Sequence, residues 1–515
     1  MRLDHTMSDE NTQVLLLHPD DDVLVALTEL PADTRLEAHG LTTRQAIPAG
    51  HKVARRDLAL GRAVRKYGQV IGETTQAVGA GEQVHTHNLH FAQFDRDLAI
   101  GSEAKPTAYV DEAERATFQG YLRPDGRAAT RNYLGVLATV NCSASVVRFI
   151  ADAVGPELLA RYPHVDGVVA LGHGTGCGQS AASLGFEHLQ RCLAGYARHP
   201  NFAGVLLVGL GCEVNQISSL MENMSLSDGP LLRTMNIQDA GGTAKTVSWG
   251  LEVLGEMLQA ADQARRQTLP ASHLMLGLEC GGSDAYSGLT ANPALGAAAD
   301  LLVAHGGTAI LSETPEIYGA EHLLTRRAVS REVGDKLAAR IKWWEGYTAL
   351  HGASLDNNPS PGNKAGGLTT ILEKSLGAVA KGGTSNLVEV YEYARPVTAK
   401  GMVFMDTPGY DMPSITGMVA GGANLVCFTT GRGSVCGSKP APSLKLATNS
   451  AMYQRMAEDM DVNCGLIAEG KASVEDMGRA IFELVLATAS GRASKSEALG
   501  FGDQEFVPWQ VGAML

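Results

Sequence analysis

A regular alternation of apolar and amphipathic stretches begins near residue 118 and leaves few folds open to this chain. Each apolar run has the length of a buried strand, and intervening stretches, such as residues 145–160 and 180–197, carry the apolar period of a helix. Strands that alternate with helices predict a parallel sheet with helices on its faces. The strand candidates of this region are residues 133–140, 167–171, 204–210 and 273–278.

The preceding residues predict a different structure, with short strands separated by Gly and Pro turns and with segment 45–53 echoed by segment 76–84. Because 515 residues are too many for one ordinary core, we expect several domains. The expected organisation is a small β domain at 1–92, a polar linker at 93–117, an α/β domain at 118–350 and a C-terminal α/β domain at 351–515. Strands near 387–391, 401–405 and 424–429 and a helix near 474–489 are expected in the last domain.

Composition excludes several classes of partner. The formal net charge is -13 and Lys and Arg form no run, which argues against nucleic-acid binding. The longest apolar run, residues 202–210, is too short to cross a bilayer. The acidic N-terminus lacks the pattern of a secretory signal, so a cytoplasmic protein is expected. A homo-oligomer is compatible with this chain length, although the sequence does not count subunits.

Four of the eight cysteines follow four successive predicted strands. The carboxyl ends of parallel strands lie along one edge of a sheet, where such folds bind ligands, so the four thiols are expected to converge. One interpretation is that they are small residues used for packing. The other is a metal site that holds either one iron ion or an iron–sulfur cluster. These residues are Cys142, Cys177, Cys212 and Cys280.

A pair of histidines ends the N-terminal β domain. His85 and His87 stand two positions apart in a segment that we predict to be a strand, which would place both imidazoles on one face. His173, in a glycine-rich loop just before Cys177, is a similar candidate. Surface strands also carry such pairs by chance, so the alternative is a pair without a ligand.

Two glycine-containing loops are candidates for binding an anion. Gly281 and Gly282 precede Ser283 and Asp284, and glycines at the start of a helix free backbone amides to face an anion. A plain strand-to-helix turn explains the same glycines. Arg432 follows another apolar strand, and its guanidinium matches a carboxylate. The alternative for Arg432 is a surface salt bridge.

Taken together, these segments resemble the altronate and galactarate dehydratase family of hydro-lyases. The resemblance covers nearly the whole chain, and the N-terminal part is similar to the SAF domain, a β-clip module. The matching segments are residues 167–178, Gly209-Leu210-Gly211-Cys212-Glu213, Cys280-Gly281-Gly282-Ser283-Asp284, Thr290-Ala291-Asn292-Pro293, residues 358–364, Lys374-Ser375-Leu376-Gly377 and residues 428–433.

The resemblance implies an α/β protein in which the SAF domain precedes a two-part body with parallel sheets. It also implies a lyase that depends on ferrous iron and removes water from an aldonic or aldaric acid, giving a 2-keto-3-deoxy acid. Segments 84–88, 316–321 and 365–370 resemble the altronate branch, so D-altronate is the expected substrate. Galactarate or another sugar acid, an iron–sulfur enzyme of the same family, and a sugar-acid-binding protein are the alternatives.

Site roles follow as hypotheses. The expected catalytic residues are Lys374, Lys364 and His85, with Lys374 or a histidine as the base and with Arg432 and Lys364 holding the acid. Iron is expected on ligands drawn from His85, His87, Cys142, Cys177, Cys212 and Cys280, or as a [4Fe-4S] cluster on the strand-end cysteines. Further substrate contacts are expected from Ser283, Asp284, Asn292, Asn363 and Thr430.

Overall fold

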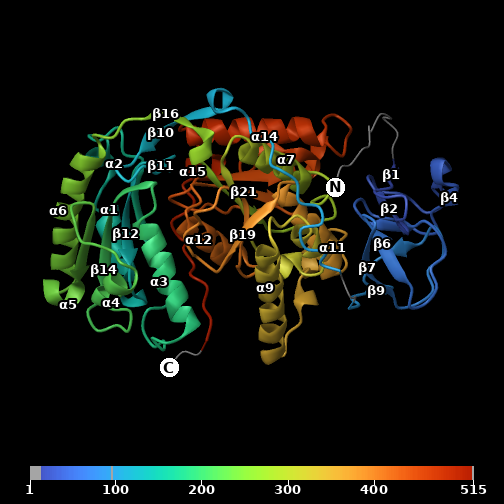
Figure 1. Ribbon diagram of the computed structural model, residues 1–515, viewed down its shortest axis with the longest axis horizontal. Helices are drawn as coiled ribbons and strands as arrows, with labels where there is room; N and C mark the ends of the chain where they lie inside the picture. The colour runs from blue at the N-terminus through green and yellow to red at the C-terminus, as the bar shows by residue number, and fades with distance from the viewer. Residues whose placement is uncertain (1–12, 94–96, 513–515) are drawn as a thin grey trace.

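The computed structural model describes residues 13–93 and 97–512. Three bodies lie in a row, with the N-terminal domain at one end, a second domain at the other and the C-terminal domain between them (Figure 1). In the described parts of the chain, none of the helices combines the length and apolarity needed to cross a bilayer.

The N-terminal domain is built from two small antiparallel sheets and a hairpin. Its repeat is visible in the structure, because Ile47 bridges to Leu30 while Val78, at the equivalent position of the second copy, bridges to Leu58. The strands are, in sheet order, β1 (Val14–Leu15), β2 (Val23–Ala26), β5 (Lys52–Ala54) and β8 (Gln83–Val84), then β6 (Ala63–Lys66), β7 (Gln69–Thr74) and β9 (Leu89–His90), with hairpin β3 (Arg35–Leu36) and β4 (Leu41–Thr42). The repeat therefore gives two similar hairpin-like units whose strands β5 and β8 pair with each other.

The second domain contains a four-stranded parallel sheet with helices on both faces. One face of the sheet packs on helices α1 (Ala144–Asp152) and α6 (Thr243–Ala261). Leu137 and Leu207, from the other face, share a core with α3 (Leu184–Ala197). The strand order is β13 (Gly167–Leu171), β12 (Tyr133–Ala138), β14 (Phe202–Gly209) and β15 (Leu232–Asn236).

The C-terminal domain contains a seven-stranded parallel sheet. Helices α7 (Ala291–Ala304) and α14 (Val474–Ala489) pack together over one face, and α12 (Asp411–Gly421) lies on the other face, against α3 of the second domain. The strand order is β19 (Leu387–Tyr391), β20 (Gly401–Met405), β18 (Thr308–Leu311), β17 (Met275–Cys280), β21 (Leu425–Thr430), β22 (Ser443–Ala447) and β23 (Val462–Asn463).

The expected division at residue 350 does not coincide with a division between sheets. Strands β17 and β18 precede it, yet they lie in the centre of the seven-stranded sheet. Residue 350 is the end of a long helix, α9 (Arg331–Leu350), after which the chain returns to the same sheet. The remaining short helices are α2 (Pro156–Leu159), α4 (Ile217–Asn223), α5 (Ile237–Ala240), α8 (His322–Thr325), α10 (Pro361–Ala365), α11 (Ile371–Val379), α13 (Ser450–Arg455) and α15 (Lys495–Ala498).

Most predicted elements of the body are present. Elements β13, β19, β20 and α14 have the predicted bounds. The single helix predicted over residues 145–160 is instead two helices, α1 and α2. The break covers residues 153–155, and proline, which has no amide hydrogen and clashes with a preceding helical turn, occupies the first position of α2.

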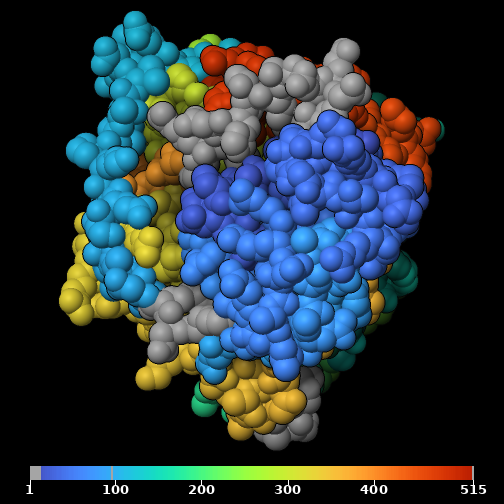
Figure 2. Space-filling model, turned by 90° about the vertical axis from the view of Figure 1, so that its right-hand side faces the viewer, coloured from blue at the N-terminus to red at the C-terminus, as the bar shows by residue number. Residues whose placement is uncertain are grey.

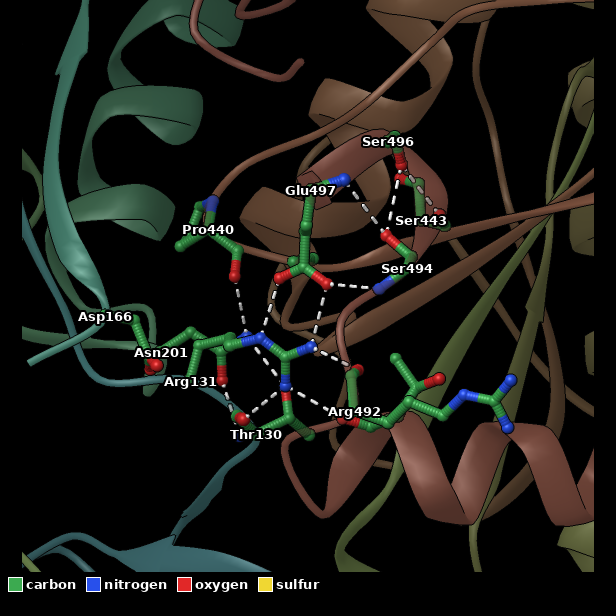
Figure 3. Close-up of polar contacts among 12 residues, drawn as sticks. Thr130, Arg131, Asp166, Asn201, Pro440, Ser443, Arg492, Ser494, Ser496 and Glu497 are labelled. Carbon is green, nitrogen blue, oxygen red and sulfur yellow. Dashed lines mark hydrogen bonds and ion pairs between the residues drawn. The ribbon is translucent and has the colours of Figure 1, made fainter. Parts of the chain in front are cut away.

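A largely buried ion pair joins the second domain to the C-terminal domain. The guanidinium of Arg131 donates from Nε and Nη2 to the Glu497 carboxylate at 2.7 and 2.8 Å, and it also donates to backbone carbonyls of Thr130, Thr488 and Arg492 (Figure 3). Close by, a small antiparallel sheet crosses between the bodies. Its strands are β11 (Ala128–Ala129), β10 (Thr117–Leu122) and β16 (Gln267–Pro270).

Three buried histidines of the second domain predict a loss of stability in acid. Burial lowers the pKa of His173 to about 4 and the pKa of His188 and His199 to about 3. Below pH 6.5 the unfolded chain binds protons at these imidazoles and the folded chain does not, so the free energy of unfolding falls as the pH drops. For His199 this loss is on the order of 3 kcal/mol between pH 6.5 and pH 4.

Urea unfolding at a series of pH values measures this effect. Replacing the buried His199 by Gln is expected to flatten the pH dependence, whereas His351→Gln, at an exposed position, is expected to leave it unchanged. An identical slope in the wild-type chain and the His199→Gln variant would contradict the prediction.

Candidate active site

A group of charged side chains is buried at the carboxyl edge of β17 and β18. These strands are parallel neighbours with Leu278 opposite Leu311, so the residues that follow these two positions come together. Glu279 and Cys280 end β17, Glu313 follows β18, and Glu316 lies in the turn after it. All four side chains are at most 3% exposed. We call this group, together with Asp411, Lys374 and Lys381, the charged centre.

Two lysines enter the centre from the segment that includes α11. Lys381 Nζ lies 2.7 Å from Cys280 Sγ and 2.8 Å from Glu313 Oε2. Lys374 Nζ lies 2.6 Å from Glu316 Oε1 and 2.9 Å from Asn358 Oδ1. Four carboxyl groups, including Asp411 at the start of α12, face only these two ammonium groups within the centre. The fully ionised carboxylates would therefore leave a net charge of about -2 in a buried volume, which is costly unless something offsets it.

The pKa shifts agree with this shortage of positive charge. Burial and then Glu313 raise the pKa of Glu279. Burial, then Glu313 and Glu316, raises the pKa of Asp411 to about 7. By contrast, burial opposes ionisation of Glu316, but Lys374 and Lys381 outweigh it and lower its pKa. Either protons or a cation must complete the charge balance of Glu279 and Asp411.

The same side chains could hold a metal ion. Ligand atoms within 4.8 Å of one another form two groups, Cys280 with Glu313 and Glu316, and Glu279 with Glu313 and Asp411. Oε1 of Glu279 and Oε1 of Glu313 are buried and have no hydrogen-bond partner among the described residues. Glu313 also has a left-handed backbone with φ 67°, which is uncommon for a residue with a side chain and occurs often at functional sites. The unpartnered oxygens indicate a position for a cation.

A narrow cavity separates this centre from the N-terminal domain. It has room for about one water molecule. Lys374 lines it from the charged centre, Lys66 and Tyr67 line it from the N-terminal domain, and Ser283 and Asp284 line it from the loop after β17. A larger ligand at this position therefore requires the two domains, or the loops between them, to shift apart.

The N-terminal domain is fastened to the body by a second buried charge group. Glu373 of α11 accepts hydrogen bonds from Lys52 at 2.9 and 3.0 Å and from Lys66 at 2.8 Å, and all three side chains are at most 1% exposed. One carboxylate cannot fully offset two buried ammonium groups, so burial and Lys66 lower the pKa of Lys52 to about 8. Figure 2 shows the N-terminal domain covering this end of the body.

The predicted strand at the histidine pair is wrong, because residues 85–88 form a turn between β8 and β9. Asn88 holds the turn, since its Nδ2 donates to the Gln83 carbonyl and its Oδ1 accepts from the His85 amide. His87 is exposed, while His85 is half-buried and lies 4.7 Å from His51 between ring centroids. Burial, then Lys52 and His51, lowers the pKa of His85 to about 4, so the imidazole is neutral near pH 7.

Each of the three domains matches a known protein family. Family models match residues 12–92 (Altronate/galactarate dehydratase SAF domain), 120–262 (D-galactarate dehydratase/Altronate hydrolase, second domain) and 271–514 (D-galactarate/Altronate dehydratase, C-terminal). Altronate dehydratase of Bacillus subtilis (strain 168) is 35% identical over 497 residues, which is 94% of this chain and 96% of that protein. The chain belongs to the altronate and galactarate dehydratase family.

Two further members of the family come from Escherichia coli (strain K12). Its galactarate dehydratase (L-threo-forming) is 36% identical over 484 residues, 92% of each chain. Its altronate dehydratase is 34% identical over 493 residues, 95% of this chain and 97% of that protein. Membership confirms the predicted family, the SAF domain and the class of carbon–oxygen lyases. The similar identities do not separate the altronate branch from the galactarate branch.

The four strand-end cysteines were expected to converge at one sheet edge. This prediction is wrong for Cys280, which belongs to a different sheet from the other three. Cys142, Cys177 and Cys212 follow neighbouring strands of the four-stranded sheet and are exposed. Cys280 is buried in the charged centre of the other sheet. The sequence pattern could not separate two sheets whose strands alternate with helices in the same way. The imidazole of His173 bonds to Thr175 and to a backbone carbonyl.

Most of the expected substrate contacts make their hydrogen bonds within the chain. Asp284 accepts from Ser287, Thr448 and Asn449, and so ties three loops together. The Asn292 amide bridges Thr429 and the Gly377 carbonyl. The Asn363 amide closes the capping box of α10 and donates to the Ser283 carbonyl, and Thr430 Oγ1 accepts from the Gly433 amide. These side chains hold the loops around the centre.

The two predicted anion-binding cations lie nearer the surface. Arg432 is exposed beside Gly282, and no ion pair of its guanidinium is found within residues 13–93 and 97–512. Lys364 is half-buried in α10. Substrate binding by either residue stays a prediction.

Several residues of the site were not predicted as such. Glu313 follows the apolar run 308–311, so the strand-end rule applied to the cysteines would have found it had that run been taken as a strand. No such sequence signal marks Lys381 or the group of Lys52, Lys66 and Glu373. The residues that these side chains contact are more than 60 positions away in the sequence.

Proposed function

We propose that this chain removes water from a sugar acid, D-altronate in preference to other sugar acids, at the charged centre. The proposal rests on the unpartnered, buried carboxylate oxygens of Glu279 and Glu313, in a centre whose carboxyl groups outnumber its ammonium groups. An anionic substrate would be repelled by this centre as it stands. A bound divalent cation would offset that excess of negative charge.

We infer that iron is the cation and that Glu279, Glu313 and Asp411 hold it. This group contains both unpartnered oxygens, and a thiol, Cys280, lies within reach of Glu313. Oxygen ligands with a nearby sulfur suit a softer ion than magnesium or calcium. When bound, iron supplies a Lewis acid for the carboxylate and a hydroxyl of the substrate. The exposed position of His87 makes the histidine pair a weaker candidate for this ion.

The chain's own residues then handle the protons. Lys374 belongs to the charged centre and also lines the cavity beneath the N-terminal domain, so its ammonium lies where a substrate would arrive. Burial opposes its charge, but Glu316 outweighs burial and raises the pKa of Lys374. Lys374 is therefore suited to giving a proton from Nζ to the departing hydroxyl, and not to acting as the base. The proton removed from C2 would pass to the Glu316 carboxylate, which lies 2.6 Å from Lys374 Nζ and can return that proton to the lysine.

An assay of the anaerobically purified chain tests this proposal. Altronate, galactarate and other sugar acids are incubated with and without added ferrous iron, and 2-keto-3-deoxy product is measured. We expect product from altronate only with iron, and at least about a 10²-fold lower rate for Lys374→Met. Faster turnover of galactarate would assign the chain to the other branch. A lack of product from every acid, with full iron loading, would refute the dehydratase proposal.

A further inference from the structure

The three exposed cysteines of the chain all lie at one edge of one sheet. Strands β13, β12 and β14 are parallel neighbours, with Leu171, Leu137 and Leu207 in register. Cys177 stands six residues after the first of these positions, and Cys142 and Cys212 stand five residues after the other two. The other five cysteines are buried. The register therefore places three thiols at comparable positions on three adjoining loops of the second domain, which lies at the end of the molecule opposite the N-terminal domain (Figure 1).

The three loops are bonded to one another. The Asn141 amide donates to the Thr175 carbonyl at 2.8 Å, which joins the loop of Cys142 to the loop of Cys177. The Asn215 amide donates to the Gly176 carbonyl at 3.0 Å, and its side chain donates to the Thr139 carbonyl at 2.9 Å, which joins the loop of Cys212 to the other two. These bonds fix the relative positions of the loops.

A glycine makes this close approach possible. Gly176 has φ 97°, and a Cβ at this position would lie 2.5 Å from the Thr139 carbonyl oxygen and 2.8 Å from Val140 Cα. Any other residue would push the loop of Cys177 away from the strand that leads to Cys142. The backbone therefore keeps the three cysteine loops together, although none of these three thiols is buried in a core.

The spacing of the sulfurs selects among metal centres. Thiolates that share one tetrahedral zinc ion lie about 4 Å apart, given a metal–sulfur distance of about 2.3 Å. The groups of described residues whose ligand atoms lie within 4.8 Å of one another do not include these three cysteines. At least two of the three sulfurs therefore lie farther apart than one ion needs, whereas in a cluster each thiolate binds a different iron. Thiolates are also the ligands that iron–sulfur clusters prefer.

We propose that Cys142, Cys177 and Cys212 hold a [4Fe-4S] cluster at the carboxyl edge of the four-stranded sheet, leaving one iron without a protein thiolate. Each thiol loses its proton to solvent as its sulfur binds one iron. Gln238 Nε2 already donates to Cys212 Sγ at 3.3 Å, a contact of the kind that tunes the potential of a cluster. This site lies in the second domain, apart from the charged centre, and it goes beyond the proposed function.

Reconstitution of the full chain tests the proposal. The anaerobic protein is incubated with iron salts, sulfide and a thiol reductant, desalted, and measured for iron, sulfide and visible sulfur-to-iron absorption. We expect about four iron and four sulfide per chain. The triple variant Cys142→Ala/Cys177→Ala/Cys212→Ala is expected to lose them, and the matched control Cys464→Ala, a buried cysteine elsewhere, is expected to keep them. Circular dichroism confirms that each variant is folded.

Thiol accessibility gives a second readout. A thiol reagent is expected to label three cysteines rapidly in the cluster-free wild-type chain and none of these three after reconstitution. Iron without sulfide, a single zinc ion per chain, no bound metal, or a cluster retained by the triple variant would each overturn the proposal.

The two proposals fail separately. A chain that turns over altronate with ferrous iron but assembles no cluster refutes the cluster and leaves the dehydratase proposal intact. A chain that assembles the cluster but dehydrates no sugar acid refutes the dehydratase proposal and leaves the cluster proposal intact.

Discussion

Replacing Glu313 by Gln is expected to lower kcat/KM for sugar-acid dehydration by about 10²- to 10³-fold and to remove tightly bound iron. Glu313 belongs to both groups of candidate ligands in the charged centre, and one of its oxygens is buried without a partner. The amide keeps the size of the side chain but removes the negative charge that a cation would meet. Its loss also leaves the Lys381 ammonium, now 2.8 Å from Oε2, without its carboxylate.

Iron content and steady-state kinetics of purified protein check this expectation. The matched control is Glu332→Gln, because Glu332 is an exposed carboxylate of the same domain whose ion pair is with Lys336 at the surface. The control is expected to retain iron and activity. A folded Glu313→Gln variant with full iron loading and a near-normal rate would place the metal elsewhere.

Replacing Glu373 by Gln is expected to weaken the attachment of the N-terminal domain by about 3–5 kcal/mol. The change leaves Lys52 and Lys66 buried together without the carboxylate that both contact, and an uncompensated buried charge is costly. Hydrogen exchange should therefore rise in β5 and β6, which carry these lysines, before the body unfolds.

Two variants calibrate this result. Lys66→Met leaves one lysine opposite one carboxylate, so a smaller loss is expected than for Glu373→Gln. Lys336→Met breaks ion pairs at the surface and is expected to cost less than about 1 kcal/mol. Equal exchange in β5 and β6 of the wild-type chain and the Glu373→Gln variant would show that the buried charge group does not hold the domain.

Local pattern predicted most of the body correctly. Strands such as β13 and β20 are short apolar runs bounded by polar turns, and an amphipathic period marks α14, so each element is encoded within its own residues. The helix predicted over 145–160 failed at Pro156, where proline begins a second helix. The strand predicted at His85 failed because the Asn88 side chain bonds back to the Gln83 carbonyl and the His85 amide and stabilises a turn instead.

The candidate site was only partly visible in the sequence. Cys280 and Lys374 were singled out in the sequence. Lys381 and Glu313 become partners of Cys280 only because β17 and β18 lie side by side and the turn Ala380–Gly382, just after α11, contacts both strands. The four strand-end cysteines looked equivalent in the sequence, and the structure divides them between two sheets. Strand order depends on contacts between distant segments, which a local period does not encode.

Motifs and periodicity are properties of neighbouring residues, so they were enough to predict the family, the α/β class and the types of residue available for chemistry. Which of those residues meet depends on the folded structure. It buried Glu279, Glu313 and Glu316 with two lysines, and it left Cys142, Cys177 and Cys212 together at an exposed edge. The reason is physical: the energy of a buried charge or a thiol depends on what surrounds it in space, and those surroundings come from the packing of the whole chain.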